Sequence, residues 1–429
     1  MPFVNSLPDE LLEAIFEQFI HTPHPTELSS ADLETHAPEQ LKALVTTSSI
    51  DSRWRNITIS TSKLWTCVIV TTDLVKKGVA VGRSIVSAFV ERSKNRSISV
   101  YLALPPDTYP LHGEFMAVYE PIIPHLHRCF SFCCDMLGEK MIRLLFPLIG
   151  PMPRLSMLLL GGNTLIPFDF PPITVFAEPS SLTALRDVMI VGVPITPIPD
   201  NSIDSLAIAV VHTSSTWKIS LIASSSNITS LEVYDRDVFR TLAQTPLALP
   251  NLKVLHHSYY PVTPYLEAPV LEEIHWMEAS LTALTTYGST YLPTVKELYL
   301  HKPRPYYHNQ PPSLKLIFPK LHKLVLDEAP MPSTVLRALL LPHTIGPDAQ
   351  ASEGAKPIAL PSPALKLVIL KTTGEEDLDA LSSVLADLLE SYKHTRLSHN
   401  GLETFPKGDH SFWVQLKELS GARVFTNET

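Results

Sequence analysis

Two groups of residues in this 429-residue sequence have side chains that could bind a metal or a phosphate. The first group, His21, His24 and His36, lies in one polar, proline-rich stretch and could in principle ligate a metal. Histidines in such a stretch are usually solvated, so we expect no metal there. The second group is the segment 78–84, GVAVGRS, which has the wrong spacing for a phosphate-binding loop and an arginine in place of its lysine. We expect no nucleotide there.

The cysteines also fail to form a recognisable reactive site. Three of the four lie together, at Cys129, Cys133 and Cys134, without the spacing of zinc ligands and too few for a disulfide framework. Buried, reduced thiols are the better interpretation. The sequence contains no GxSxG elbow and no HExxH helix. We therefore expect no enzyme activity, no catalytic residue, no cofactor and no metal.

Composition excludes further classes of function. There are 34 Lys+Arg against 43 Asp+Glu, so the net charge of -9 provides no basic field for nucleic acid or anionic lipid. With 45% apolar residues the chain is expected to be ordered. The start lacks the features of a secretory signal, and prolines and arginines interrupt the apolar stretch 142–160. We expect a soluble cytoplasmic or nuclear protein that binds neither nucleic acid nor membrane.

The first seventy residues have the periodicity of short helices. Pro8 and Asp9 favour a helix start, and the helix is predicted to continue to about Ile20. Its apolar residues recur at spacings of three and four: Leu11, Leu12, Ile15, Phe16 and Phe19. After the polar segment 21–38, a second helix contains Leu41, Leu44 and Val45, a third contains Trp54, Ile57 and Ile59, and a turn holds Leu64 and Trp65. Such short helices make a weak independent core, so part of this surface is expected to contact another chain.

Three segments together carry a resemblance to a known family. LPDELLEAIFEQF at 7–19, SRWRNI at 52–57 and STSKLW at 60–65 resemble, in order and spacing, the F-box common among fungal F-box proteins. The resemblance implies docking onto the Skp adaptor of a Skp/cullin/F-box ubiquitin ligase and, through the adaptor, onto cullin. The residues that it implies for this contact are Leu7, Pro8, Leu11, Leu12, Ile15, Phe16, Leu64 and Trp65.

A linking region of helix and strand units is predicted next. Residues 75–93 have the pattern of a helix, and 98–104 alternate like a strand. The same order returns in a helix over 114–128 and a strand over 129–134. The predicted organisation is therefore an F-box helical domain over 1–70, linking units over 71–140, and a repeat region over 141–429.

The repeat region is recognised by the phrase proline-x-apolar-x-x-apolar-x-apolar. Clear instances are 153–160, 250–257, 269–276, 293–300, 319–326 and 363–370, and weaker ones are 185–190, 203–208 and 228–233. Most steps between them are 18 to 30 residues, which fits leucine-rich repeats. The last two apolar positions of each phrase have strand spacing. The predicted fold class is therefore α/β, with three amino-terminal F-box helices followed by an irregular leucine-rich-repeat-like solenoid.

In this solenoid, short parallel strands would line the concave side, with helices and loops on the convex side. The segment 346–363 is interpreted as an exposed insertion. A helix over 377–390 is expected to cap the last strand.

The residue between the last two apolar positions of each phrase should point to the concave face. In order these residues are Leu159, Met189, Ala207, Glu232, His256, His275, Tyr299, Val325 and Ile369. We expect the last six to bind a protein substrate, flanked by Glu273, Met277, Glu297, His301, Lys323 and Asp327. Alternatively, loops or the capping helix cover part of this row, and its residues serve only packing.

These patterns favour a substrate-recognition subunit of a Skp/cullin/F-box ubiquitin ligase that recruits a protein on its repeats. One alternative is a non-catalytic repeat scaffold that does not join a ligase, in which the amino-terminal helices simply cap the repeats. A second is an enzyme on an unrecognised fold, which would need a deep pocket with convergent polar groups. Adaptor binding distinguishes the first two.

Overall fold

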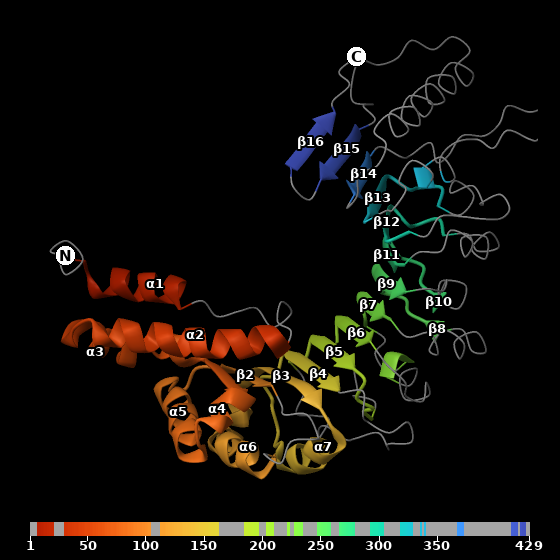
Figure 1. The fold of residues 1–429 in the computed structure, drawn as a ribbon. Coiled ribbons are helices and arrows are strands. Elements are labelled where there is room, and N and C mark those ends of the chain that lie inside the picture. The colour runs from red at the N-terminus through yellow and green to blue at the C-terminus, as the bar shows by residue number, and fades with distance from the viewer. Residues whose placement is uncertain are drawn as a thin grey trace, which may run out of the picture. The chain divides into compact units, whose positions relative to one another are not determined.

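The chain has a mixed α/β fold with a mostly parallel sheet and several helices (Figure 1). This computed structural model describes residues 7–20, 30–103, 112–162, 184–196, 203–209, 221–223, 227–234, 247–258, 266–278, 292–303, 318–328, 335–336, 339, 367–372, 413–418 and 421–425. Side chains are described in these ranges except at 30–37, 136, 208–209 and from 367 onward. The chain divides into two compact units, unit 1 (Met1–Ser225) and unit 2 (Ser226–Thr429). The domain boundaries predicted at residues 70 and 140 stay predictions.

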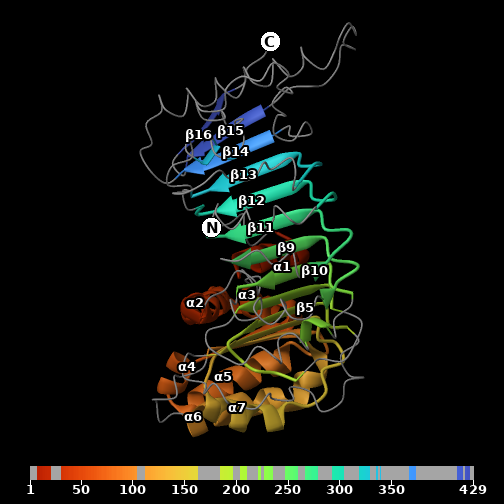
Figure 2. The ribbon, with the colours of Figure 1, turned by 90° about the vertical axis from the view of Figure 1, so that its right-hand side faces the viewer.

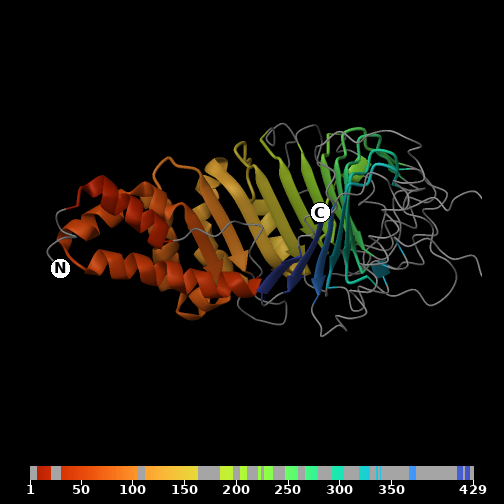
Figure 3. The same cartoon turned by 90° about the horizontal axis from the view of Figure 1, so that it is seen from above.

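Unit 1 begins with helices close to those predicted. They are α1 (Asp9–Phe19), α2 (Ser30–Ser49), α3 (Ser52–Ser60) and the 3₁₀ turn η3 (Ser62–Trp65). The Asp51 carboxylate accepts a hydrogen bond from the backbone N–H of Trp54 at 2.8 Å and so caps α3. Helix α2 starts earlier than predicted and contains Pro38 in its interior. Figure 3 shows these helices together at the amino-terminal end of the unit.

The rest of unit 1 alternates helices with parallel strands. The elements are β1 (Cys67–Thr71), α4 (Thr72–Lys76), α5 (Val79–Arg92), β2 (Ile98–Ala103), α6 (His112–Tyr119), η4 (Glu120–Arg128), β3 (Cys129–Leu137), α7 (Glu139–Leu145), η5 (Phe146–Leu148), β4 (Met157–Gly162), β5 (Asp187–Val191) and β6 (Ser205–Ala209). The strands pair in sequence order, each parallel to the next. The predicted helix and strand order of this region is therefore present.

Two predicted helices of this region differ in detail. The helix predicted over 75–93 is interrupted at Gly78, whose φ of 109° only glycine adopts readily, so α4 ends before it and α5 begins after it. The helix predicted over 114–128 becomes 3₁₀ in η4, where Pro121 and Pro124 remove the backbone donors that an α-helix needs.

Helices lie on both faces of the first strands of unit 1. On one face α2 crosses β1, where the Gln40 amide donates a hydrogen bond to the Cys67 carbonyl at 3.4 Å. Beneath it lies a buried cluster of Cys67, Ile69, Tyr101, Ala103 and Cys133. On the other face α5 packs against β1, and Figure 1 shows α5, α6 and α7 on the side away from α2. These strands are therefore covered on both sides.

Unit 2 is built from short strands, seen side by side in Figure 2. They are β7 (Ser230–Val233), β8 (Leu247–Ala248), β9 (Val254–Ser258), β10 (Leu266–Glu267), β11 (Glu273–Met277), β12 (Glu297–His301), β13 (Lys323–Asp327), β14 (Leu367–Thr372), β15 (Trp413–Glu418) and β16 (Gly421–Phe425). The order β7-β9-β11-β12-β13-β14-β15 is parallel, β16 is antiparallel to β15, and β8 pairs with β10 separately. Each predicted phrase is therefore a parallel strand, as expected.

In three phrases of unit 2 the proline has a structural role. In Ala268-Pro269-Val270-Leu271 the backbone N–H of Leu271 donates to the Ala268 carbonyl at 3.2 Å, which closes a turn with proline at its second position. Leu252 and Leu321 close equivalent turns onto Leu249 and Phe318, both at 3.2 Å. The leucine after the turn is buried in all three cases. Proline thus fixes the turn, and leucine anchors the strand that follows.

A second regularity follows the strands of unit 2. The residue directly after β11, β12 and β13 has a left-handed backbone: φ is 50° at Glu278, 48° at Lys302 and 51° at Glu328. Such angles are uncommon outside glycine, so their repetition marks the same sharp exit from successive strands. The insertion predicted at 346–363 and the capping helix at 377–390 lie outside the described residues.

Candidate functional site

Helix α1 uses half of its apolar stripe to pack against its own chain. Leu12 and Phe16 are buried, and the Phe16 ring lies 4.9 Å from the Trp54 ring between centroids. Leu64 and Trp65, in the 3₁₀ turn η3, are buried as well. Because these side chains lie inside unit 1, they anchor the helices in this conformation.

Trp65 is held by three different contacts. Its indole N–H donates to the Thr58 carbonyl at 2.8 Å, and its ring meets the Phe89 ring edge-on at 5.1 Å. The Arg92 guanidinium lies over the same ring, 4.4 Å from the centroid, which is a cation–π geometry. Trp65 therefore joins the amino-terminal helices to α5.

The other half of the stripe remains in contact with solvent. Leu11 is 51% exposed, Ile15 is 47% exposed and Phe19 is 62% exposed. Their spacing of four residues places them on one side of α1. Phe19 was not among the contact residues implied by the resemblance, although its place in the same periodic stripe could have identified it. Large apolar side chains gathered at this exposure are suited to contact with another surface.

Leu7 and Pro8 lie at the start of α1. Pro8 is exposed, and its carbonyl accepts hydrogen bonds from the backbone N–H groups of Leu11 and Leu12, both at 3.2 Å. Leu7 is half-buried, and its carbonyl accepts a hydrogen bond from the Arg53 guanidinium. Arg53 also pairs with the Asp9 carboxylate. The start of α1 is thus fixed to α3.

In unit 2 the predicted row of outward residues is present in register. Glu232 pairs with His256, His256 with His275, His275 with Tyr299, Tyr299 with Val325, and Val325 with Ile369. Glu232, His256, His275 and Tyr299 are half-buried, whereas Val325 is 1% exposed. For Ile369 the structure describes the backbone alone. The accessible part of the row therefore lies between Glu232 and Tyr299.

The predicted row also has three members in unit 1. Leu159 pairs with Met189, and Met189 pairs with Ala207. Leu159 and Met189 are half-buried, and Ala207 is buried. These three side chains are apolar, so the polar chemistry of the row is confined to unit 2.

The rings of the row in unit 2 form a stack. The centroids of His256 and His275 are 3.9 Å apart with planes at 11°, and those of His275 and Tyr299 are 4.0 Å apart at 7°. The Lys323 ammonium lies 4.9 Å from the Tyr299 ring centroid. Parallel strands space equivalent side chains by about 4.8 Å, which is close to the separation of stacked rings. The sheet itself therefore sets the stack.

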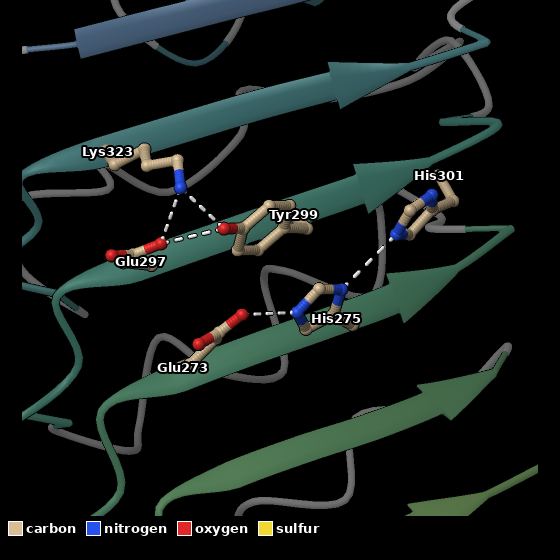
Figure 4. A network of polar contacts seen from close by, with 6 residues as sticks. All are labelled: Glu273, His275, Glu297, Tyr299, His301 and Lys323. Atoms are coloured by element: carbon tan, nitrogen blue, oxygen red, sulfur yellow. Dashed lines mark hydrogen bonds and ion pairs between the residues drawn. The ribbon is translucent and has the colours of Figure 1, made fainter. Parts of the chain in front are cut away.

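A chain of hydrogen bonds runs along one side of the stack (Figure 4). His275 Nε2 lies 2.6 Å from Glu273 Oε1, and His275 Nδ1 lies 3.4 Å from His301 Nε2. His301 Nδ1 lies 2.9 Å from Asp327 Oδ2. The two imidazole rings therefore link the Glu273 carboxylate to the Asp327 carboxylate through their ring nitrogens.

Tyr299, Lys323 and Glu297 form a second polar group (Figure 4). The Tyr299 hydroxyl donates to Glu297 Oε2 at 2.7 Å, and the Lys323 ammonium donates to Glu297 Oε2 at 2.8 Å and to the Tyr299 oxygen at 2.6 Å. Burial alone would raise the pKa of Glu297, but the hydrogen bonds from Lys323 and Tyr299 outweigh it and lower the pKa. Glu297 is therefore a carboxylate already neutralised by a lysine.

Burial changes the ionisation of two other members. Burial, followed by the proximity of His275, lowers the pKa of His256 from 6.5 to about 4 despite the nearby carboxylates of Glu232 and Glu273. Burial, followed by the proximity of Glu297, raises the pKa of Glu273 above its usual value. At neutral pH the face therefore presents a neutral His256 ring between acidic side chains.

The arrangement is suited to binding through hydrogen bonds, stacking and charge. Among the described residues, no group of three or more histidine, cysteine or acidic side chains is arranged to hold a metal ion. His21 and His24 lie outside the described residues, and the side chain of His36 is not described. Cys129, Cys133 and Cys134 are buried free thiols.

Comparisons with known proteins do not place the chain in a family: no family model and no curated protein matches it. Within the described part of the chain, no helix combines the length and apolar character needed to cross a membrane.

Proposed function

We propose that the chain is a substrate-recognition subunit of a Skp/cullin/F-box ubiquitin ligase. In this proposal the amino-terminal helices are an F-box that docks the Skp adaptor. The strands of units 1 and 2 then belong to an irregular leucine-rich-repeat-like solenoid that recruits a protein substrate. Catalysis of ubiquitin transfer resides elsewhere in the complex, and this chain contributes proximity by holding the substrate nearby.

The observation that carries the proposal is the division of α1 into two apolar sides within the segment that resembles an F-box. One side, with Leu12 and Phe16, is buried in the chain, while the other, with Leu11 and Ile15, is about half exposed. The docking role is therefore proposed for the accessible part of the predicted set: Leu7, Pro8, Leu11 and Ile15, with Phe19 added. The buried members hold α1 in place.

Capture by the purified Skp adaptor tests this proposal. Burying the exposed half of two such side chains is worth about 2 kcal/mol in total. Leu11→Gln/Ile15→Gln is therefore expected to weaken capture of the full chain by about tenfold or more. Leu7→Ala/Pro8→Ala should weaken it as well. Glutamine preserves helix propensity, so α1 should remain formed.

Val81→Gln/Leu144→Gln is the matched control. These side chains are also apolar, helical and exposed, at 49% and 44%, but they lie in α5 and α7, outside the proposed docking helix. The control should be captured like the wild type. Equal weakening in both double variants would point to a general loss of structure, and no capture of folded wild type would favour the scaffold alternative.

A further inference from the structure

The outward face of β7, β9, β11, β12 and β13 has more acidic than basic side chains. Its carboxylates are Glu232, Glu273, Glu297 and Asp327, and the lysine described on it is Lys323. Lys323 is committed to Glu297. Among the side chains that the structure describes on these strands, four carboxylates stand against this one lysine, which is an acidic excess.

The excess is concentrated around His256. Glu232 lies beside His256 on the neighbouring strand, and Glu273 lies diagonally across from it on the other side. Both carboxylates act electrostatically on the His256 ring. Glu232 accepts a hydrogen bond from the Tyr234 hydroxyl at 3.3 Å, and Glu273 is bonded to His275 at 2.6 Å. Among the described residues, no lysine or arginine forms an ion pair with either carboxylate.

Partial burial of a carboxylate costs free energy when no cation lies beside it. The Glu273 side chain is only 30% exposed, so it has lost much of its hydration, and its hydrogen-bond partner is the His275 ring rather than a lysine or arginine. His256 does not supply the missing charge, because its imidazole is neutral at neutral pH. A cation brought by a partner would form charge-assisted hydrogen bonds with both carboxylates and offset this cost. The same face would repel phosphate and other anions.

We propose that this face, centred on Glu232, His256 and Glu273, docks an extended protein segment bearing lysine or arginine side chains. Glu232 and Glu273 lie two strands apart and two residues out of register, so about 12 Å separates their places on the sheet. An extended segment rises about 3.3 Å per residue, so cations about three to four residues apart match that separation. The inference rests on the proposed function in one respect: it takes the bound segment to belong to the recruited substrate.

The probe is a labelled nonapeptide, (Gly-Ser-Arg)₃, with the matched (Gly-Ser-Glu)₃ as the acidic comparison. Binding to the full chain is followed by fluorescence anisotropy. The basic peptide is expected to bind and the acidic peptide not to bind. Raising the salt from about 0.05 M to about 0.5 M should weaken binding strongly, because the Debye length falls below the spacing of the charges.

Glu232→Gln/Glu273→Gln tests the two carboxylates directly. It should weaken binding of the basic peptide about fivefold or more. The matched control is Glu267→Gln/Glu272→Gln, which removes the same charge from two exposed positions of unit 2 outside the proposed docking face. The affinity of this control variant for the basic peptide should stay within about twofold of the wild-type affinity.

Equal binding of both peptides, absence of binding by the basic peptide, or equal weakening in both variants would overturn the inference. Adaptor capture is measured on the same preparations. Intact capture with no basic-peptide binding would refute this inference alone, whereas basic-peptide binding without capture would refute the proposed function alone.

Discussion

The ring of His275 lies parallel to that of Tyr299, with 4.0 Å between centroids and 7° between planes, although 24 residues separate them in sequence. The two residues are register partners on β11 and β12. The contact therefore depends on the length of the repeat, because each successive repeat places its equivalent residue in the same row of the sheet. Such a row brings together polar and aromatic side chains that are distant in sequence, so no short sequence motif contains them.

The stack should contribute to the stability of unit 2. Tyr299→Phe keeps the ring but removes the hydroxyl that bonds to Glu297 and Lys323, and it is expected to cost about 1 kcal/mol. Tyr299→Ala removes the ring as well and should cost about 2 kcal/mol more, since stacking and apolar contact are both lost. Urea unfolding measures both changes. Equal midpoints for the two variants would show that the stack contributes nothing.

His256 should make the folded state sensitive to acid. Its folded pKa of about 4 lies below the ordinary 6.5, so between these values the unfolded chain binds a proton that the folded chain does not. The stability associated with the neutral ring is present above pH 6.5 and is lost as pH falls toward 4. At pH 5 the loss should be about 1 to 2 kcal/mol.

The comparison for this prediction is His256→Gln, which cannot titrate. Between pH 7 and pH 5 the wild type should lose more unfolding free energy than the variant, as measured by urea midpoints at each pH. Identical pH profiles would mean that His256 is not the group responsible.

Much of the sheet could be predicted from the sequence because each strand carries a local signal. A proline that fixes a turn, then a buried leucine, then alternating apolar residues is repeated at 269–276 and 319–326. Because each strand starts from an equivalent buried leucine, the same position of every strand falls in one outward row, and that row could be predicted. The helix predicted over 75–93 is divided at Gly78 because the backbone φ there is positive. The spacing of apolar residues carries no information about backbone angles. The β15–β16 hairpin lacks the proline phrase and was not predicted.

The site was predicted less completely than the strands. The stripe on α1 contains five apolar positions, which is wider than one packing face, and periodicity alone does not tell whether Leu11 or Leu12 points to the chain. The bond from His275 to His301 depends on rotamers of residues on two different strands. Burial of Val325 within the outward row was also not predicted, since it depends on what surrounds that end of the row.

The cysteines are expected to be unreactive in the native protein. Burial, followed by the proximity of Cys133, raises the pKa of Cys67 from 9.0 to about 12, and burial raises that of Cys133 to about 12. Because the thiolate is the reactive form, labelling by a disulfide reagent at pH 8 should be very slow in the folded chain. In urea all four thiols should react at once. Rapid labelling of the native protein would contradict the burial.

These raised pKa values also predict alkaline destabilisation. The folded chain holds its thiol protons more tightly than the unfolded chain, so the stability they contribute is complete below pH 9.0 and falls as pH rises toward 12. Cys67→Ala should therefore lose less stability than the wild type between pH 8 and pH 10.5. Equal losses, measured by urea midpoints, would assign the effect to other groups.

The central claim is that this chain joins a ubiquitin ligase through α1. Isothermal titration of the purified full chain with the purified Skp adaptor tests it most directly. The account predicts a saturable 1:1 interaction with a negative heat-capacity change, because apolar side chains such as Leu11 and Ile15 leave water on binding. Absence of any binding heat at several temperatures, from a chain shown to be folded by circular dichroism, would contradict the account.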